Sequence, residues 1–240
     1  MTQSGALRSE TAGEEAETAF LRFCGQTFEL LPSGAMFWRA EETLLVADLH
    51  LEKLSSFART GQLLPPYDTR LTLGKLERDI NRTGARRVMA LGDSFHRDEG
   101  TRTLPEPDRA RLNALTRRAE WLWLSGNHDP SPHALGGRCL PVVEIGGVTF
   151  THEPGPGVNG LVAGHLHPAA RVVMNGRSVR RPCFVQDGRL LILPAYGSAT
   201  GNLNILGPAF AGLFQWPALE VTMLGRERLY PVNPRRLVAG

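Results

Sequence analysis

The sequence has few cysteines and no long apolar run, and both absences restrict its class. Cys24, Cys139 and Cys183 form no C-x-x-C pair, which argues against a disulfide framework and against a thiolate zinc site. No stretch approaches the ~18 consecutive apolar residues that a membrane span needs. Residues 1–20 also lack the apolar segment of a signal peptide. We therefore expect a poorly ordered N-terminal tail on a cytoplasmic protein with no membrane partner.

Lysine is nearly absent, and arginine takes its place. Lys53 and Lys75 are the only lysines, so 25 of the 27 basic residues are arginines, and the formal net charge is +3. Guanidinium groups match phosphate oxygens, which favours a phosphate-bearing partner, although genome base composition can produce the same bias. The hydrophobic and charged fractions, 42% and 21%, are those of an ordinary globular protein. Residues 21–240 are expected to form a single domain.

From about residue 44 onward, apolar strand-like runs alternate with helical patterns. The apolar runs cover 44–47, 88–91 and 121–124. Apolar residues at helical spacing lie between Tyr67 and Gly84, and again from Leu112 to Ala119. This alternation is typical of βαβ units and predicts a mostly parallel sheet.

Three turn pairs mark the second half of the chain: Gly146-Gly147, Asn175-Gly176 and Asp187-Gly188. Each pair lies between β-rich segments, which is the pattern of a β-hairpin. The second half should therefore hold antiparallel strands. Together the two halves predict an α/β fold of two packed sheets with helices outside.

Six of the seven histidines lie in five short polar motifs, each at the end of a strand-like run. The motifs are Asp48-Leu49-His50, Gly92-Asp93-Ser94-Phe95-His96, Gly126-Asn127-His128-Asp129, Thr151-His152-Glu153 and Gly164-His165-Leu166-His167. Ligands of open α/β sheets bind beyond the carboxyl ends of the strands, so these loops are expected to surround one cleft. His133 lies outside every motif and is interpreted as a structural histidine.

The polar motifs supply imidazole, carboxylate and amide donors without thiolate, a mixture that suits Mn, Fe or Zn. The candidate metal ligands are Asp48, His50, Asp93, Asn127, His152, His165 and His167. Seven donors exceed the four of one structural zinc, so we expect two divalent ions. Two ions that share one carboxylate stabilise both the attacking and the leaving oxygen of phosphoryl hydrolysis. Asp93 is expected to be the shared carboxylate.

The ordered series D-x-H, G-D, G-N-H-D, H and G-H-x-H resembles the calcineurin-like metallophosphoesterase superfamily. Within it, Val46–Lys53, residues 61–69, Gly92–Arg97 and Leu193–Gly201 resemble the bacterial ligase-associated DNA-damage-response branch. The resemblance covers about residues 25–215. It implies a four-layer α/β/β/α sandwich of two mixed β-sheets flanked by helices.

The family pattern also divides the ligands between the two ions. Asp48, His50 and His167 would hold the first ion, Asn127, His152 and His165 the second, and Asp93 both. His128 would stay unligated and donate a proton to the leaving alkoxide, and Asp129 would orient the His128 ring.

Two positions depart from the family pattern. His96 stands where the superfamily often has an acidic residue, and Glu52 stands where the ligase-associated branch has glycine. Neither departure removes a metal ligand. Arg97, beside the G-D motif, is a candidate contact for a substrate phosphate, and His96 is a second candidate for touching substrate.

The resemblance implies a Mn-dependent phosphodiesterase and endonuclease that hydrolyses single-stranded or flexible DNA in DNA repair. Proteins of that branch are grouped with an ATP-dependent DNA ligase, a helicase and an exonuclease, which are therefore the expected partners. One alternative keeps the metal centre but hydrolyses cyclic nucleotides or other small phosphodiesters. The loop 63–67 and the segment 97–107 are the candidate walls that would decide between the two substrates.

A further alternative is a non-catalytic scaffold that binds a partner protein, but such scaffolds lose ligands that this chain retains. Trp121 and Trp123 could stack on nucleobases. Their alternation with Leu122 and Leu124 instead favours a strand covered on both faces.

Overall fold

The structure, a computed structural model, describes residues 19–58, 67–155 and 157–239. Most of the predicted tail and most of the loop 63–67 lie outside these residues. Ala19 and Phe20, the last two residues of the predicted tail, belong to strand β1 (Ala19–Phe23), which pairs with β2 (Gln26–Leu30). Backbone pairing with β2 holds these two residues in a strand, although Phe20 is exposed.

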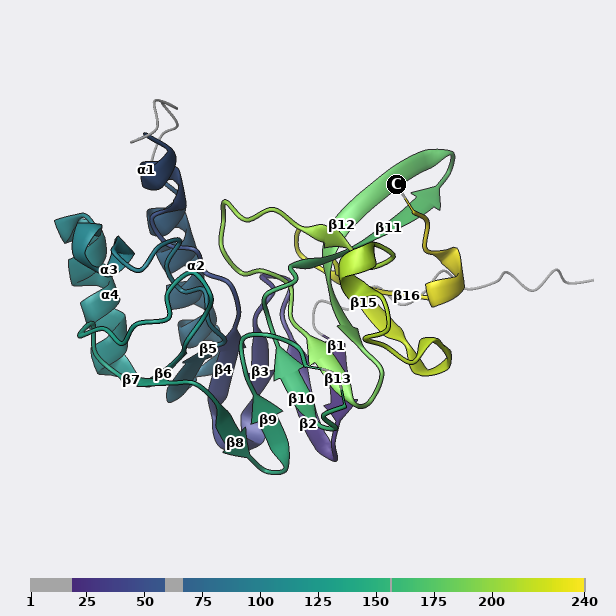
Figure 1. The fold of residues 1–240 in the computed structure, drawn as a ribbon, viewed down its shortest axis with the longest axis horizontal. Helices are drawn as coiled ribbons and strands as arrows, with labels where there is room; N and C mark the ends of the chain where they lie inside the picture. Colours follow the sequence, from purple (N-terminus) through teal and green to yellow (C-terminus); the bar gives the residue numbers. More distant parts are fainter. Residues whose placement is uncertain (1–18, 59–66, 156, 240) are drawn as a thin grey trace, which may run out of the picture.

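Seven strands form the first sheet, in the order of the sequence (Figure 1). The strands after β2 are β3 (Met36–Trp38), β4 (Thr43–Val46), β5 (Arg87–Ala90), β6 (Glu120–Leu124) and β7 (Arg138–Leu140). Neighbours from β1 to β4 are antiparallel, whereas neighbours from β4 to β7 are parallel. The three predicted parallel strands are confirmed as β4, β5 and β6.

The α-helices of the described residues lie together on one side of the first sheet (Figure 1). They are α1 (Lys53–Ala58), α2 (Asp68–Thr83), α3 (Gly100–Thr103) and α4 (Glu106–Arg118), and a 3-10 turn, η1, covers Arg39–Glu41. Helix α2 ends as predicted at Gly84, whose φ of 67° lets its N–H bind the Ile80 carbonyl. Ala119 is extended, so the second predicted helix ends one residue earlier. None of these helices has the length and apolarity to cross a bilayer.

Nine strands form the second sheet, in which β10 pairs in parallel with β9 and β13, and most other pairs are antiparallel. The strands are β8 (Val143–Ile145), β9 (Val148–Phe150), β10 (Leu161–Ala163), β11 (Pro168–Met174), β12 (Arg177–Gln186), β13 (Leu190–Ile192), β14 (Leu203–Asn204), β15 (Glu220–Leu224) and β16 (Leu229–Val232). All three predicted turn pairs join antiparallel strands, namely β8–β9, β11–β12 and β12–β13.

The outer layer of the second sheet differs from the expected helices. In the described residues it contains the 3-10 turns η2 (Pro208–Phe210) and η3 (Trp216–Ala218), and a further turn, η4 (Pro234–Arg236), follows β16. Buried Phe210 and Leu219 from this layer pack against strand residues of the sheet. Glycines and prolines interrupt residues 207–217 and disfavour an α-helix there. The two mixed sheets are confirmed, but only one carries α-helices.

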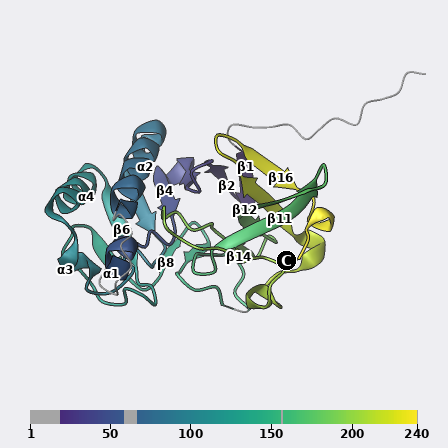
Figure 2. The same cartoon turned by 90° about the horizontal axis from the view of Figure 1, so that it is seen from above.

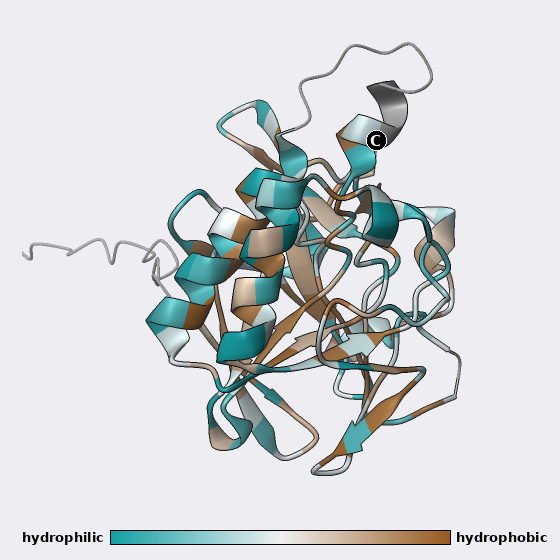
Figure 3. Ribbon diagram, turned by 90° about the vertical axis from the view of Figure 1, so that its left-hand side faces the viewer, coloured by the Kyte–Doolittle hydropathy of each residue, from teal (hydrophilic) through white to brown (hydrophobic). Residues whose placement is uncertain are grey.

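Strand β6 shows how the layers are held together. Trp121 and Trp123 pack into the core beneath the helices, whereas Leu122 and Leu124 pack into the core between the sheets. The prediction of a strand covered on both faces is confirmed. Figure 3 views the helical side and shows mainly hydrophilic helix surfaces in front of hydrophobic strands. Seen from above, the molecule runs from α4 at one end to β11 and β16 at the other (Figure 2).

Candidate metal centre

The polar motifs meet where parallel strands of both sheets end. Backbone pairing continues beyond β4 and β5: the N–H of Asp48 donates to the Gly92 carbonyl (3.3 Å), and the N–H of His50 donates to the Asp93 carbonyl (2.9 Å). From the second sheet, the N–H of His165 donates to both carboxylate oxygens of Asp48 (3.1 and 3.0 Å). These bonds fix three loops against one another and bring their side chains to one place.

The first group of candidate ligands contains Asp48, His50 and His167. The Nε2 atoms of His50 and His167 are 3.3 Å apart, and Nε2 of His167 is 3.4 Å from Oδ1 of Asp48. All three donor atoms lie within 4.8 Å of one another. Asp48 and His50 are buried, so this group is largely shielded from water.

The second group is arranged around His152. Its Nε2 atom lies 3.0 Å from Oδ1 of Asn127 and 3.1 Å from Nδ1 of His165. His152 is buried, whereas His165 is partly accessible. The structure therefore brings together the three residues that the resemblance assigns to the second ion.

Asp93 lies between the two groups. Its Oδ1 is 3.3 Å from Nε2 of His152, and its Oδ2 is 3.6 Å from Nε2 of His50. One carboxylate oxygen thus faces each group, which is the placement expected of a bridging ligand. The Asp93 carboxylate is held in this position by the N–H of His128, which donates to Oδ1 (2.9 Å).

Two backbone carbonyls orient the imidazole rings. Nδ1 of His152 binds the Leu91 carbonyl (2.9 Å), and Nδ1 of His167 binds the Gly201 carbonyl (3.1 Å). Because a carbonyl only accepts, each Nδ1 carries the hydrogen and each Nε2 keeps its lone pair for the centre. Sequence reasoning missed both carbonyls, since a carbonyl has no side-chain signature. The only sequence signal for the Gly201 carbonyl was the resemblance of Leu193–Gly201 to the ligase-associated branch.

The backbone at this centre is strained. Left-handed φ values occur at Asp48 (55°), His50 (42°), Asp93 (47°), His165 (69°) and His167 (47°). Non-glycine residues rarely adopt this region, which costs roughly 1–2 kcal/mol per residue. Five of the seven candidate ligands share it, and such strain gathers at functional sites.

A motif glycine allows the centre to close. A Cβ atom at Gly126 would lie 2.2 Å from both the backbone nitrogen and Oδ1 of Asp93. Any side chain there would displace the carboxylate that faces both groups. The glycine of the G-N-H-D motif is therefore required by close approach of backbone to Asp93.

The charged groups of the centre attract positive charge. Burial would lower the pKa of His152, but its hydrogen bond to Asp93 and the carboxylates of Asp48 and Asp93 raise that pKa to about 9. Burial opposes ionisation of Asp93, yet the bond to His152 holds its pKa below the usual range. Burial lowers the pKa of His50, which favours its neutral form. Without a metal ion, His152 therefore carries the positive charge that the surrounding carboxylates stabilise.

The donor set fits divalent metal ions. Ring nitrogens of His50, His152 and His167 lie 3.0–3.6 Å from another ring nitrogen, from the Asn127 amide oxygen or from carboxylate oxygens. Facing lone pairs repel unless a cation or a proton lies between them. Nitrogen and oxygen donors without thiolate are the set that Mn, Fe or Zn accepts.

His128 borders the centre without belonging to either group. Its Nδ1 binds the backbone carbonyl of His96 (3.1 Å), and its Nε2 lies 4.0 Å from Oδ2 of Asp93. The rings of His96 and His128 stack with centroids 5.2 Å apart. The His128 side chain is 40% exposed, so a substrate can reach its Nε2 atom.

The predicted role of Asp129 is wrong. Nδ1 of His128 is bound to the carbonyl of His96, so Asp129 does not orient that ring. The buried Asp129 instead accepts the N–H of Phe95 through Oδ2 (3.0 Å). Burial raises the pKa of Asp129 to about 7. Asp129 therefore joins the G-N-H-D loop to the loop that carries Asp93.

The remaining sequence candidates lie around the centre. Arg97 is exposed in the loop after β5, four residues beyond Asp93. His133 packs against the rings of Phe95 and Trp123, with centroids 5.5 and 4.9 Å away, and its structural interpretation is confirmed. Glu52 has a φ of 65°, which explains why glycine suits that position.

Glu52 keeps this conformation through contacts with neighbouring hydroxyl groups. Its carboxylate accepts hydrogen bonds from Ser55 (2.6 Å) and Thr69 (3.0 Å). The departure from the family pattern thus fastens the Asp48–His50 loop to α2.

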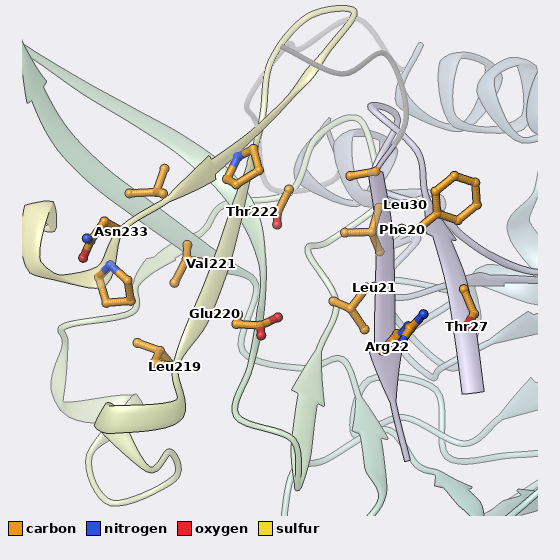
Figure 4. Close-up of a pocket in the computed structure, with 14 residues that line it drawn as sticks. Phe20, Leu21, Arg22, Thr27, Leu30, Leu219, Glu220, Val221, Thr222 and Asn233 are labelled. Carbon is orange, nitrogen blue, oxygen red and sulfur yellow. The ribbon is translucent and has the colours of Figure 1, made fainter. Parts of the chain in front are cut away.

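A separate groove lies between β1 and β15 (Figure 4). Its volume is about 820 Å³, and its walls include Phe20 and Arg22 on one side and Glu220 and Thr222 on the other. No histidine is among the described residues that line it. The chemistry-bearing residues therefore gather at the metal centre and not in this groove.

Comparison with solved structures finds chains of similar fold. A nuclease, MPE from Pseudomonas putida, superposes with a TM-score of 0.70 at 28% identity, and the match covers 90% of this chain and 100% of that chain. The phosphoesterase YfcE from E. coli matches 82% of this chain and 96% of its own at 17% identity, with a TM-score of 0.35. Zinc-bound Vps29 from Entamoeba histolytica matches 79% and 96% at 14% identity, with a TM-score of 0.33.

The nuclease match spans nearly the whole chain. The resemblance of the chain to the calcineurin-like metallophosphoesterases is thereby confirmed. The protein is a metal-dependent phosphoesterase with an α/β fold of two mixed sheets. No family model and no curated protein matches the sequence itself.

Proposed function

We propose that this metallophosphoesterase is a binuclear-metal-dependent phosphodiesterase that cleaves DNA as an endonuclease. The observation that carries the proposal is Asp93, whose two oxygens face two separate donor groups. The likeness to a nuclease over nearly the whole chain supports nucleic acid as the substrate.

Two ions in these groups would neutralise the charge that develops on the phosphoryl oxygens. One ion would be held by Asp48, His50 and His167, and the other by Asn127, His152 and His165. Asp93 lies between the two groups. The carbonyls of Leu91 and Gly201 keep the imidazole donors directed inward.

His128 supplies the proton for the leaving alkoxide. Its Nδ1 hydrogen is used by the His96 carbonyl, so a transferable proton stands on Nε2 of the imidazolium form. Nε2 lies 4.0 Å from Oδ2 of Asp93, and the His128 side chain is partly exposed. His96, whose ring stacks on that of His128, and Arg97, which follows His96 in the chain, are the proposed contacts for substrate phosphate.

The finer features of the proposal rest on the resemblance to the ligase-associated branch. They are Mn as the metal, single-stranded or flexible DNA as the substrate, and DNA repair in the cytoplasm as the setting. An ATP-dependent DNA ligase, a helicase and an exonuclease are the proposed partners.

The test is hydrolysis of bis-p-nitrophenyl phosphate and of a labelled single-stranded oligonucleotide, each with Mn and with a chelator. The Asp93→Ala variant, purified identically, controls for contaminating nucleases. Mn-dependent cleavage of both substrates by the wild type alone would support the proposal. Cleavage of the small diester alone would replace DNA with a small phosphodiester, and no cleavage with any divalent metal would indicate a binding protein.

A further inference from the structure

The hairpin of β11 and β12 begins at the metal centre and carries two arginines face to face. Strand β11 starts at Pro168, directly after the candidate ligand His167. In the antiparallel register Arg171 lies opposite Arg180, so both side chains emerge on the same face of the hairpin. Figure 1 shows this hairpin projecting beyond the rest of the second sheet.

Nothing in the described protein neutralises this pair. Neither Arg171 nor Arg180 forms an ion pair with an acidic side chain of residues 19–58, 67–155 or 157–239. The Nε atoms of both are buried and have no hydrogen-bond partner there. Like charges directly opposite one another destabilise a sheet, and a buried donor without an acceptor costs more free energy. Stability alone therefore does not account for the pair.

The pair is connected to the metal centre through one short segment. A terminal nitrogen of Arg180 donates to the carbonyl of Asn202. The neighbouring Gly201 carbonyl binds His167, and the Leu203 N–H donates to the His167 carbonyl (2.9 Å). The guanidinium of Arg180 and the ring of His167 are thus held by adjacent residues.

The spacing suits a chain of phosphates. Arg171 follows His167 by four residues, and the strand is extended from Pro168 onward, so the Cα atoms of His167 and Arg171 lie up to about 13 Å apart at roughly 3.3 Å per residue. This span corresponds to about four nucleotides at the 3.4 Å axial rise of a B-form strand, and to fewer in an extended strand. Guanidinium forks bind phosphate oxygens in pairs.

We propose that Arg171 and Arg180 form a second phosphate site that holds an oligonucleotide a few nucleotides away from the bond to be cleaved. This inference rests on the proposed endonuclease function and identifies a site that binds the DNA substrate away from the cleaved bond. A small diester cannot span the two sites, so the pair selects for length.

The test compares the wild type with the Arg171→Gln/Arg180→Gln variant on oligonucleotides of two to twelve nucleotides and on bis-p-nitrophenyl phosphate. In the wild type kcat/KM should rise once the oligonucleotide spans both sites. In the variant this rise should fall about tenfold, chiefly through KM, relative to the small diester. Loss of one phosphate contact should also reduce the slope of log KM against log salt by about 0.7. Arg226→Ala, on the β15–β16 turn, is the matched control and should keep the length dependence.

Binding of a labelled oligonucleotide to Asp93→Ala protein, followed by fluorescence anisotropy, separates the two proposals. Weaker binding when Arg171 and Arg180 are also replaced would support the site even if the wild type cleaves no DNA, a result that would overturn only the proposed function. Unchanged binding, length dependence and salt slope would overturn the second phosphate site. An equal loss on the small diester would also overturn it, because the arginines would then act by supporting His167.

Discussion

Among the buried polar clusters of the described residues, two differ clearly in how their hydrogen-bonding groups are matched. In the first, the Lys75 cluster, Nζ of Lys75 donates to the carbonyls of Ser33 (3.1 Å) and Tyr196 (2.5 Å), and the Tyr196 hydroxyl donates to Asp79 (2.7 Å). In the metal centre, ring nitrogens face one another, as at His50 and His167 (3.3 Å), and Nδ1 of His50 has no partner in the described residues. The Lys75 cluster is complete without a ligand, whereas the metal centre needs an added cation.

The backbone makes the same distinction. Lys75 and Asp79 lie within the regular helix α2, while five metal-centre residues have left-handed φ values. One segment touches both clusters, since the N–H of Tyr196 donates to the Ala47 carbonyl (2.8 Å) and Gly201 binds His167. Burial of polar groups is therefore no mark of function by itself. What distinguishes the metal centre is that ring nitrogens of its potential metal ligands face one another and lie on strained backbone.

The largest expected effect concerns Asp93. Replacing Asp93 with Asn removes the charge that faces both donor groups, and hydrolysis of a phosphodiester should fall by about 10³-fold or more. The melting temperature of the metal-free protein should change little, because the Asn side-chain oxygen can still accept the N–H of His128. The measurements are kcat with Mn and thermal unfolding monitored by circular dichroism.

Asp98→Asn is the matched control for Asp93. Asp98 lies in the loop after β5 and binds Ser131 at the surface. Its replacement should leave kcat within about twofold, as surface substitutions away from special features do little. Retained activity in Asp93→Asn would remove the basis of the comparison.

His128→Ala tests a residue beside the centre. Removal of a positioned proton donor should lower kcat by about 10²–10⁴-fold. Metal content, measured by elemental analysis after gel filtration, should remain that of the wild type. His128 is outside the two donor groups that Asp93 faces, although it also forms a cluster with His50 and His96. Loss of bound metal in this variant would place His128 among the ligands.

The Lys75 cluster should make the free energy of unfolding depend on pH. Burial lowers the pKa of Lys75 from 10.5 to about 8, so between these values the unfolded chain binds more protons than the folded one. The free energy of unfolding should therefore rise with pH from about 8 toward 10, by up to about 3 kcal/mol over the whole interval. Urea unfolding at several pH values measures this slope.

Lys75→Met should flatten that slope, and Lys53→Met, which changes the other lysine of the chain, should retain it. A slope that survives in Lys75→Met would show that another group titrates in this interval. The Lys75 cluster would then differ less from the metal centre than its geometry indicates.

The smallest expected effect belongs to Tyr196→Phe. This change leaves the buried Asp79 without its hydroxyl donor, which should cost about 1–3 kcal/mol of unfolding free energy. The Phe variant keeps the backbone bond to Ala47, so kcat of the folded protein should change less than threefold. A large fall in kcat with normal stability would mean that the Lys75 cluster serves catalysis.

The sequence predicted the parts of the fold that have local signatures. Alternation of Trp121 and Trp123 with leucines predicted β6, and the pair Asn175-Gly176 predicted the β11–β12 hairpin. Strands β1 to β3 were not predicted, because they lie before the alternating strand and helix patterns that begin near residue 44. They are short antiparallel strands, stabilised by pairing with one another. The outer 3-10 layer also escaped prediction, since packing on the second sheet decides it.

The sequence predicted which side chains form the site, but not their hydrogen-bond partners. Histidine and aspartate at strand ends pointed to the two donor groups. The role of Asp129 was wrong because proximity in sequence to His128 suggested a contact that the His96 carbonyl makes instead. The Arg171–Arg180 pair depends on strand register, which spacing in the sequence does not supply.

The left-handed residues of the centre also limit how this protein can be improved by design. A procedure that rewards only folding free energy would replace strained positions such as His50 and His167 with glycine or asparagine. Each exchange would make the chain more robust and remove one donor from the centre. A heat-resistant version must therefore be sought elsewhere, in the layers that the strands and helices already pack well.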